Sequence, residues 1–317
     1  MGCLALSLSA LLCAYPARAA DGMERELVAE RDAEGPPPMP SLSHQGLALD
    51  FEYAIVRATA TDVVTGEPLE GPGAYGYAAA LAASFALVPR RFYVGVAEDF
   101  ASASVPSGIS RESGGSSVVA GNPELWARAL WTSRVGLAAG GGLGAVLPLP
   151  RSFTATETEV VRVVRVMRPW GEPHFQDLTM TLRPVLDIRH MVGPVLLEAR
   201  QGIDLGVRVR DLRGHESRTE IGAQTSLFVG LRLHRTVMAG LELHEVYQLT
   251  ADVSSPSCPA PCDEHRVELS IAPSLRFRWR PIAPSLSLLL PLSTPLRAEV
   301  DSYYAARLHV GANLALD

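Results

Sequence analysis

Residues 221–244 read IGAQTSLFVGLRLHRTVMAGLELH and decide the fold. From Ile221 to Leu233 the odd-numbered residues are mostly large and apolar, and the even-numbered residues are mostly small or polar. After a break at 234–236 the same alternation continues from Val237 to Leu243. Successive side chains of a strand point to opposite faces. The two runs therefore predict two β-strands, each with one apolar and one polar face, joined by a tight turn.

A third run, from Val267 to Trp279, repeats this pattern within the stretch 218–280. The first run alone covers 221–233, whereas an ordinary strand has roughly 5–6 residues. A strand that crosses a membrane at a tilt near 45° needs about 9–11 residues in the hydrocarbon, with more at the rims. Length and period together predict the wall of a β-barrel in a membrane.

The composition limits the alternatives. The chain has 317 residues, of which 47% are hydrophobic, yet no uncharged apolar run of about 18 residues follows position 20, which argues against helical membrane spans. The net charge of −6 argues against a nucleic-acid partner.

The N-terminal residues have the composition of a secretory signal. Residues 1–20 contain an apolar core, Leu4–Tyr15, and small residues around a cleavage site near Ala19. Cys13 leaves a lipoprotein signal as an alternative. Residues 21–45 are charged and then proline-rich, which predicts a disordered periplasmic tether. The barrel is then expected to cover 46–317.

Two cysteines remain once this signal is removed, Cys258 and Cys262. They lie in a proline-rich polar loop, and an even pair in an exported chain favours a disulfide. A metal site formed with Asp263, Glu264 and His265 is the alternative. We predict no metal and no cofactor.

The rest of the chain supplies further strands. They are predicted at 46–55, 75–87, 92–100, 125–131, 136–149, 178–188, 195–209, 285–292 and 303–316. With the three runs above they give about twelve strands. Short connections near 88, 132, 190, 234 and 281 alternate with long ones near 66, 112, 163, 213, 258 and 297. Transmembrane barrels have this rhythm of tight periplasmic turns and long external loops, which places both termini on the periplasmic side.

Two of the long connections have a recognisable composition. Residues 103–123 are rich in serine and glycine and predict a loop. Residues 151–176 are the longest interruption, and the valines within 157–167 predict a hairpin that rises above the membrane.

A soluble, secreted β-sandwich that acts as a binding module is the main alternative fold, because its strands would alternate too. Its strands would be shorter, however, and its polar face would carry fewer Gly, Ala and Ser residues. Aromatic residues also lie near the predicted strand ends, where a membrane girdle is expected: Tyr75, Phe92, Trp131, Trp279, Tyr303 and Tyr304.

With its signal, tether, long alternating strands and loop rhythm, the chain resembles bacterial outer-membrane β-barrel proteins over 46–317. The resemblance implies an all-β, closed antiparallel up-and-down transmembrane β-barrel in the outer membrane, with lipid and the barrel assembly machinery as partners. Members of this class usually end in a strand with a terminal aromatic residue, whereas this sequence ends in Asp317.

Charged residues on the polar faces are the best functional candidates. The alternation points the following side chains into the lumen: Arg232, Glu242, His244, Glu268, Arg276, Arg278, Arg307 and His309. Because adjacent strands lie about 4.8 Å apart, we expect Arg232, Glu242, Glu268 and Arg276 to form a ladder across neighbouring strands. Such a cluster is either a structural plug of paired charges or a constriction that selects small polar or anionic solutes.

An outer-membrane lipid hydrolase is the enzymatic alternative. His244, Glu242 and a serine such as Ser226 or Ser270 would have to form a nucleophile–base pair. The chain has no Gly-x-Ser-x-Gly motif, and we predict no enzyme. The glycines of 140–144 loosely match a dinucleotide fingerprint, but the prolines that follow prevent the helix this motif needs. We expect these glycines to relieve crowding inside the barrel or to permit a bend.

Overall fold

The computed structural model describes most of the chain from residue 46 onward. The described ranges are 46–55, 60–61, 68–69, 75–88, 91–105, 115–133, 137–149, 153–154, 156–158, 160–161, 164, 169–176, 178–209, 219–250, 267–277, 282–293 and 304–312. The predicted signal, the tether, Cys258, Cys262 and Arg278 lie outside them.

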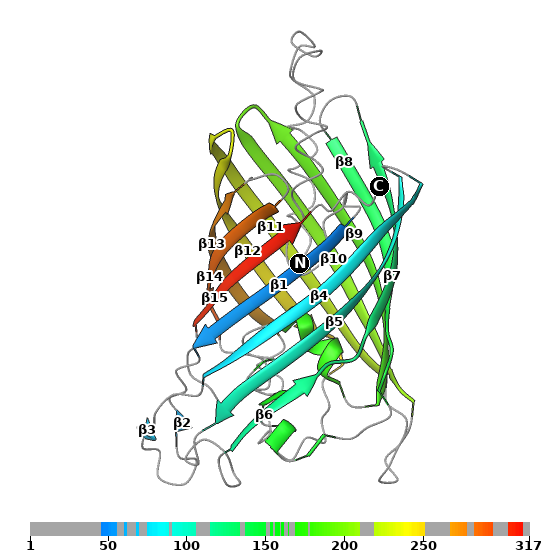
Figure 1. The fold of residues 1–317 in the computed structure, drawn as a ribbon, viewed down its shortest axis with the longest axis vertical. Helices are drawn as coiled ribbons and strands as arrows, with labels where there is room; N and C mark the ends of the chain where they lie inside the picture. The colour runs from blue at the N-terminus through cyan, green and yellow to red at the C-terminus, as the bar shows by residue number, and fades with distance from the viewer. Residues whose placement is uncertain are drawn as a thin grey trace.

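The described chain is built almost entirely from antiparallel strands (Figure 1). They are β1 (Gly46–Ile55), β2 (Ala60–Thr61), β3 (Pro68–Leu69), β4 (Tyr75–Val88), β5 (Phe92–Val105), β6 (Gly115–Ala120), β7 (Glu124–Thr132), β8 (Leu137–Val146), β9 (Thr179–Val192), β10 (Val195–Arg208), β11 (Thr219–His234), β12 (Val237–Gln248), β13 (Val267–Phe277), β14 (Ile282–Pro291) and β15 (Tyr304–Ala312). One 3-10 helix, η1 (Pro169–Phe175), precedes β9.

The strand pairings form a ring. The main sheet has 13 strands, and all of them except β6 take part in the ring. Each pairs with its neighbour in the chain from β4 to β5, from β5 to β7, and onward to β15. β1 pairs with both β4 and β15 and so completes the circuit. The predicted strand number and antiparallel order are thus confirmed, and a ring leaves no unpaired edge to face lipid.

The two ends of the barrel differ as the loop rhythm predicts. The strand ends that flank the short connections β4–β5, β7–β8, β9–β10, β11–β12 and β13–β14 lie at the upper end in Figure 1. β6, η1 and the paired strands β2 and β3 lie at the lower end. In the β9–β10 turn, Gly193 adopts a φ of 59°, which glycine accepts without strain.

The predicted loop at 103–123 is wrong in part. β5 continues past the predicted end at Phe100 to Val105, and residues 115–120 pair with this extension as β6. The extension lies at the lower end of the barrel, beyond the part of β5 that pairs with β7.

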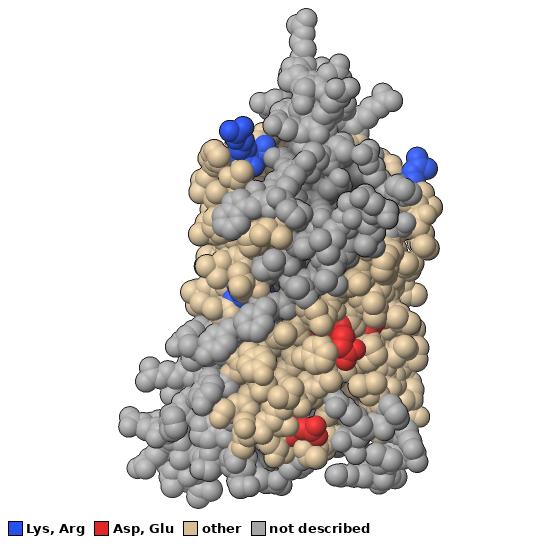
Figure 2. Space-filling view, viewed as in Figure 1, with Lys and Arg blue, Asp and Glu red and all other residues tan. Residues whose placement is uncertain are grey.

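The two faces of the strands are sorted as the alternation predicts. On β11, Leu227 and Val229 are 46% and 54% exposed on the outer wall, whereas Phe228 between them is 2% exposed. The described part of the outer wall in Figure 2 is mostly uncharged, with arginine at its upper end. Among the described residues, none of the helical segments has the length and hydropathy that a membrane-crossing helix needs.

Candidate functional site

Most of the predicted lumen residues lie inside the barrel. Glu242, His244, Glu268, Arg276 and Arg307 are all buried. Arg232 is half-buried near the upper end of β11 and donates to Met191 Sδ at 2.6 Å. The backbone of His309 on β15 pairs with Asp50 and Ser285.

The predicted ladder is not aligned in one row. The register puts Arg232 and Arg276 opposite Met238, on either side of it. Glu242 lies four residues further along β12, opposite Phe228 and Ala272, and Glu268 pairs with Val246. The four side chains are therefore staggered along the barrel axis.

The partner of Arg276 is Glu198 of β10. Arg276 Nη1 lies 3.0 Å from Glu198 Oε2, and Arg189 Nε on β9 lies 2.6 Å from Glu198 Oε1. The Arg276 guanidinium also stacks 3.6 Å from the centre of the Phe228 ring. One carboxylate thus pairs with two buried cations supplied by different strands.

The arrangement around Glu242 does not support Ser226 as the nucleophile of the hydrolase alternative. Ser226 Oγ donates to Glu242 Oε1 at 2.5 Å, and Glu242 Oε2 lies 3.3 Å from His244 Nε2. A catalytic serine must give its proton to the imidazole, with the acid behind it. Here the Ser226 hydroxyl donates its hydrogen bond to the Glu242 carboxylate and not to the imidazole, so His244 does not activate Ser226.

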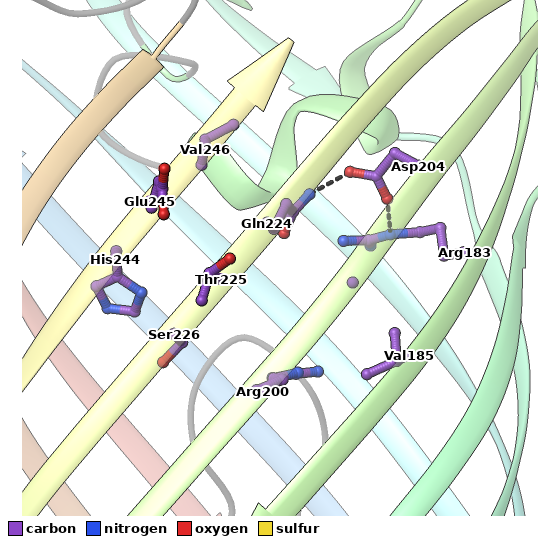
Figure 3. Close-up of a pocket in the computed structure, with 11 residues that line it drawn as sticks. Arg183, Val185, Arg200, Asp204, Gln224, Thr225, Ser226, His244, Glu245 and Val246 are labelled. Carbon is purple, nitrogen blue, oxygen red and sulfur yellow. Dashed lines mark hydrogen bonds and ion pairs between the residues drawn. The ribbon is translucent and has the colours of Figure 1, made fainter. Parts of the chain in front are cut away.

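A second group of charges surrounds Arg183 of β9. Arg183 Nε lies 2.8 Å from Asp204 Oδ1 of β10, and its Nη1 lies 3.2 Å from Glu124 Oε2 of β7. Gln224 of β11 also donates to Asp204 (Figure 3). These contacts link β7, β9, β10 and β11 through the Arg183 guanidinium and the Asp204 carboxylate.

Arg128 of β7 pairs with Asp187 of β9 between these two groups.

The glycines of β8 make room for the charged side chains of β7. A Cβ at Gly142 would lie 2.8 Å from Ala127 O and 3.0 Å from Arg128 Cγ, and one at Gly144 would lie 2.1 Å from Glu124 Oε1. The prediction that these glycines relieve crowding is confirmed.

The connection between β8 and β9 folds into the barrel, so the predicted hairpin above the membrane is wrong. Its described residues at 156–158, 160–161 and 164 are helical. Thr154 and Glu157 cap this segment: Thr154 N donates to Glu157 Oε2 at 2.8 Å, and Glu157 N donates to Thr154 Oγ1 at 3.3 Å. This reciprocal pair is a capping box.

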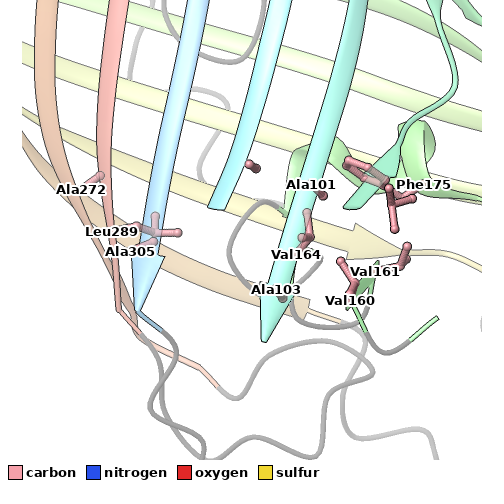
Figure 4. Close-up of a cluster of buried hydrophobic side chains, with 11 residues drawn as sticks. Ala101, Ala103, Val160, Val161, Val164, Phe175, Ala272, Leu289 and Ala305 are labelled. Carbon is pink, nitrogen blue, oxygen red and sulfur yellow. The ribbon is translucent and has the colours of Figure 1, made fainter. Parts of the chain in front are cut away.

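The inward segment packs against the small residues of the wall. Val160, Val161, Val164 and Phe175 are buried in one cluster with inward-facing residues of β4, β5, β13, β14 and β15 (Figure 4). These wall residues are Ala78, Ala101, Ala103, Ala272, Leu289 and Ala305. Short side chains on β4 and β5 leave the space that the valines and Phe175 fill. We call the described residues within 153–176, which form this inward segment, the plug.

Hydrogen bonds fix the end of the plug to the barrel. Asn122 N donates to His174 O at 2.6 Å, and Asn122 Nδ2 donates to Gln176 O at 2.7 Å. Gln176 Nε2 donates to Glu220 Oε2 at 3.1 Å. The plug is therefore attached to the residues before β7 and to β11.

His174 is the titratable contact of the plug. Its Nδ1 lies 3.0 Å from Asn122 O, which can only accept, so Nδ1 carries a proton. Its Nε2 lies 3.1 Å from Arg183 Nη1 and 3.3 Å from Glu124 Oε2. Burial alone lowers the pKa of His174, but the Asp99 and Glu124 carboxylates outweigh it, so the pKa lies above its usual value.

Two small cavities, lined by charged and polar residues together with apolar surface, run along the wall formed by β10, β11 and β12. The outer cavity lies between the plug residues Pro173 and Gln176 and the lower ends of these strands. The inner cavity is lined by Arg183, Arg200, Ser226 and His244 (Figure 3). Each has about 30 Å³ of water-accessible space, enough for a few water molecules. Asp204, Gln224 and Val246 border both cavities, which therefore adjoin.

Several lumen residues escaped the sequence prediction although the alternation contains them. Arg183, Asp187, Glu198, Arg200 and Asp204 occupy the inward positions of β9 and β10 with the same period of two. The capping-box spacing of Thr154 and Glu157 likewise signals a helix start. The described residues contain no group of three or more His, Cys, Asp or Glu side chains suited to a metal ion.

Neither family models nor curated proteins match this chain. A crystal structure of an outer membrane channel from Pseudomonas putida F1 is similar, with a TM-score of 0.58 and 9% identity, over 88% of this chain and 100% of that one. The NanC porin aligns with a TM-score of 0.49 and 9% identity, over 84% of this chain and 100% of the porin. At 9% identity the first similarity shows the fold. This chain has the fold of the outer-membrane β-barrel proteins.

Proposed function

We propose that the protein is a narrow outer-membrane channel for small polar or anionic solutes. The observation that carries this proposal is the pair of adjoining cavities beside the plug, on the wall formed by β10, β11 and β12. Around them the lumen is lined by arginine and carboxylate side chains, which select solutes by charge at close range.

The strand number supports low conductance. Barrels of about 8 strands are filled by their own side chains, whereas water-filled porins have about 16–18. The ring of this protein has a strand number between those two classes, and the plug folds into it. The path for solutes is therefore narrow and admits only small ones. The predicted export signal, cleaved near Ala19, and insertion by the barrel assembly machinery into outer-membrane lipid belong to the same proposal.

A structural wall protein is the second candidate. The ion pairs of Glu198 and the buried valines of the plug favour it, because paired charges and apolar packing fill a lumen. The two candidates differ in whether ions pass through the folded barrel.

Single-channel recording in planar bilayers tests the proposal. We expect a small unitary conductance that favours anions, and we expect Arg276→Ala to weaken this preference because it removes a buried lumen cation. Arg278→Ala is expected to do the same, since the sequence alternation predicts that Arg278 shares the face of Arg276. Arg235→Ala, on the exposed β11–β12 turn, is the control that removes the same charge from the rim.

Trimming the plug provides a further arm of this experiment. Phe175→Ala deletes a fully buried ring and is expected to increase the conductance. Folded protein that stays silent in bilayers, both with and without Phe175→Ala, would support the structural role instead.

A further inference from the structure

Arg200 of β10 is a buried cation without a hydrogen-bonded partner. The residue is 9% exposed, and neither Nη1 nor Nη2 has a hydrogen-bond partner among the described residues. Burying an unpaired guanidinium is costly, because the protein must replace the water that solvates it. Such a group is expected where a ligand supplies the missing charge.

The carboxylates around Arg200 already have other partners. On β9, Asp187 pairs with Arg128. Further along β10, Asp204 accepts from Arg183 and Gln224. On β12, Glu242 accepts from Ser226 and contacts His244. These carboxylates therefore leave Arg200 without a hydrogen-bonded carboxylate among the described residues.

The guanidinium borders the inner cavity. Arg200 lines it together with Gln224, Ser226 and His244, and Figure 3 shows these residues on one wall of the barrel. The register places Arg200 opposite Ser226, and Ser226 opposite His244, in one row of the lumen. The space of about 30 Å³ suits a small planar head group better than a bulky one.

We propose that Arg200 anchors a binding subsite for a carboxylate-bearing solute on the route through the barrel. The fork of the guanidinium matches the two oxygens of a carboxylate. This inference rests on the proposed channel function and names the class of solute that the channel holds.

A rearranged ion pair with Asp187 is the competing explanation. Asp187 lies opposite Arg200 in the register, and its Oδ1 has no hydrogen-bond partner among the described residues. If Arg200 turned to this oxygen, its guanidinium would be paired and would not bind a carboxylate.

Titration of the folded, detergent-solubilised barrel with ¹³C-acetate, followed by NMR, tests the proposal without requiring transport. We expect saturable binding in the wild type and a loss of at least roughly tenfold in affinity for Arg200→Met, since a charge-assisted bond contributes on that scale. Arg200→Lys keeps the charge but loses the fork and is expected to bind with intermediate affinity. Arg235→Met removes an arginine of the exposed turn and is expected to bind as the wild type does.

Each outcome decides between the explanations, provided that each variant migrates as a closed barrel on an unheated gel. Absence of acetate binding in the wild type, or equal binding by Arg200→Met, would overturn the subsite. If Arg200→Met does not fold, equal binding by Arg200→Lys and wild type would overturn the bidentate anchor. Saturable acetate binding that depends on Arg200, in a barrel that conducts no ions, would support the proposed subsite and contradict the proposed channel function.

Discussion

At the scale of single residues, Glu198 shows how the lumen is held together. Its two oxygens face Arg189 and Arg276, at 2.6 and 3.0 Å. Both arginines are buried, so removal of the negative charge leaves two cations without their partner inside the barrel. The stability of the wall here depends on charge balance more than on packing.

Glu198→Gln is therefore expected to lower the free energy of unfolding by about 3–5 kcal/mol, as for other broken buried ion pairs. Equilibrium unfolding of the barrel in lipid vesicles by denaturant measures the change. Glu245→Gln, at an exposed position of β12, is expected to leave stability unchanged or to raise it slightly. Equal effects of the two substitutions would show that Glu198 is not an essential ion-pair partner.

The alternation could place many individual lumen residues. It predicts the inward positions of Glu242, His244, Glu268, Arg276 and Arg307, all of which are buried. It could not predict their partners, because the period of two gives the face of a residue but not the register between strands. A carboxylate such as Glu198, far from Arg276 in the sequence, becomes its partner only once the register is set.

At the scale of elements, the plug is the part that the sequence prediction misjudged most. Its valines have a high β-propensity, which favours a strand. In the structure Val160, Val161 and Val164 are helical and buried against alanines of β4 and β5. The empty space beside these alanines exists only after the barrel has closed, so tertiary packing overrides the local preference.

β6 escaped prediction for a related reason. Its sequence, Gly115–Ala120, is short and rich in serine, without a large apolar residue at alternate positions. It becomes a strand because β5 continues below the ring and offers an open edge. A pairing partner, rather than the segment's own composition, determines this element.

The attachment of the plug is expected to depend on pH through His174. The pKa of His174 in the folded protein lies above its usual value, so the folded state binds the proton more tightly than an unfolded chain, whose histidine pKa is about 6.5. The stabilisation that protonated His174 contributes is complete below the unfolded-chain pKa. It is lost as the pH rises through the pKa of His174 in the folded protein. At acidic pH Nε2 donates to Glu124, and at higher pH it accepts from Arg183.

Hydrogen exchange of the Asn122 amide, which donates to His174 O, measures this effect after correction for the intrinsic pH dependence of exchange. We expect greater protection at pH 5.5 than at pH 8.5 in the wild type. His174→Gln cannot titrate and is expected to show no such difference. The same pH dependence in the variant would assign the effect to another group.

At the scale of the whole molecule, the fold follows from one requirement. In hydrocarbon every backbone N–H and C=O must be bonded within the protein, so strands can cross a membrane only as a closed ring. The pairings of β1 with β4 and β15 satisfy this requirement. The strand order and number are predictable from the sequence because they follow from alternation and loop length.

The central claim is that the odd-numbered side chains of β11 face lipid and the even-numbered ones face the lumen. Nitroxide labels placed one at a time at residues 226–231, in lipid vesicles and with the native cysteines replaced by serine, test it most directly. The account predicts high collision rates with membrane-dissolved oxygen at Leu227, Val229 and Leu231, and low rates at Ser226, Phe228 and Gly230. Uniform rates along the segment, or the opposite alternation, would contradict it.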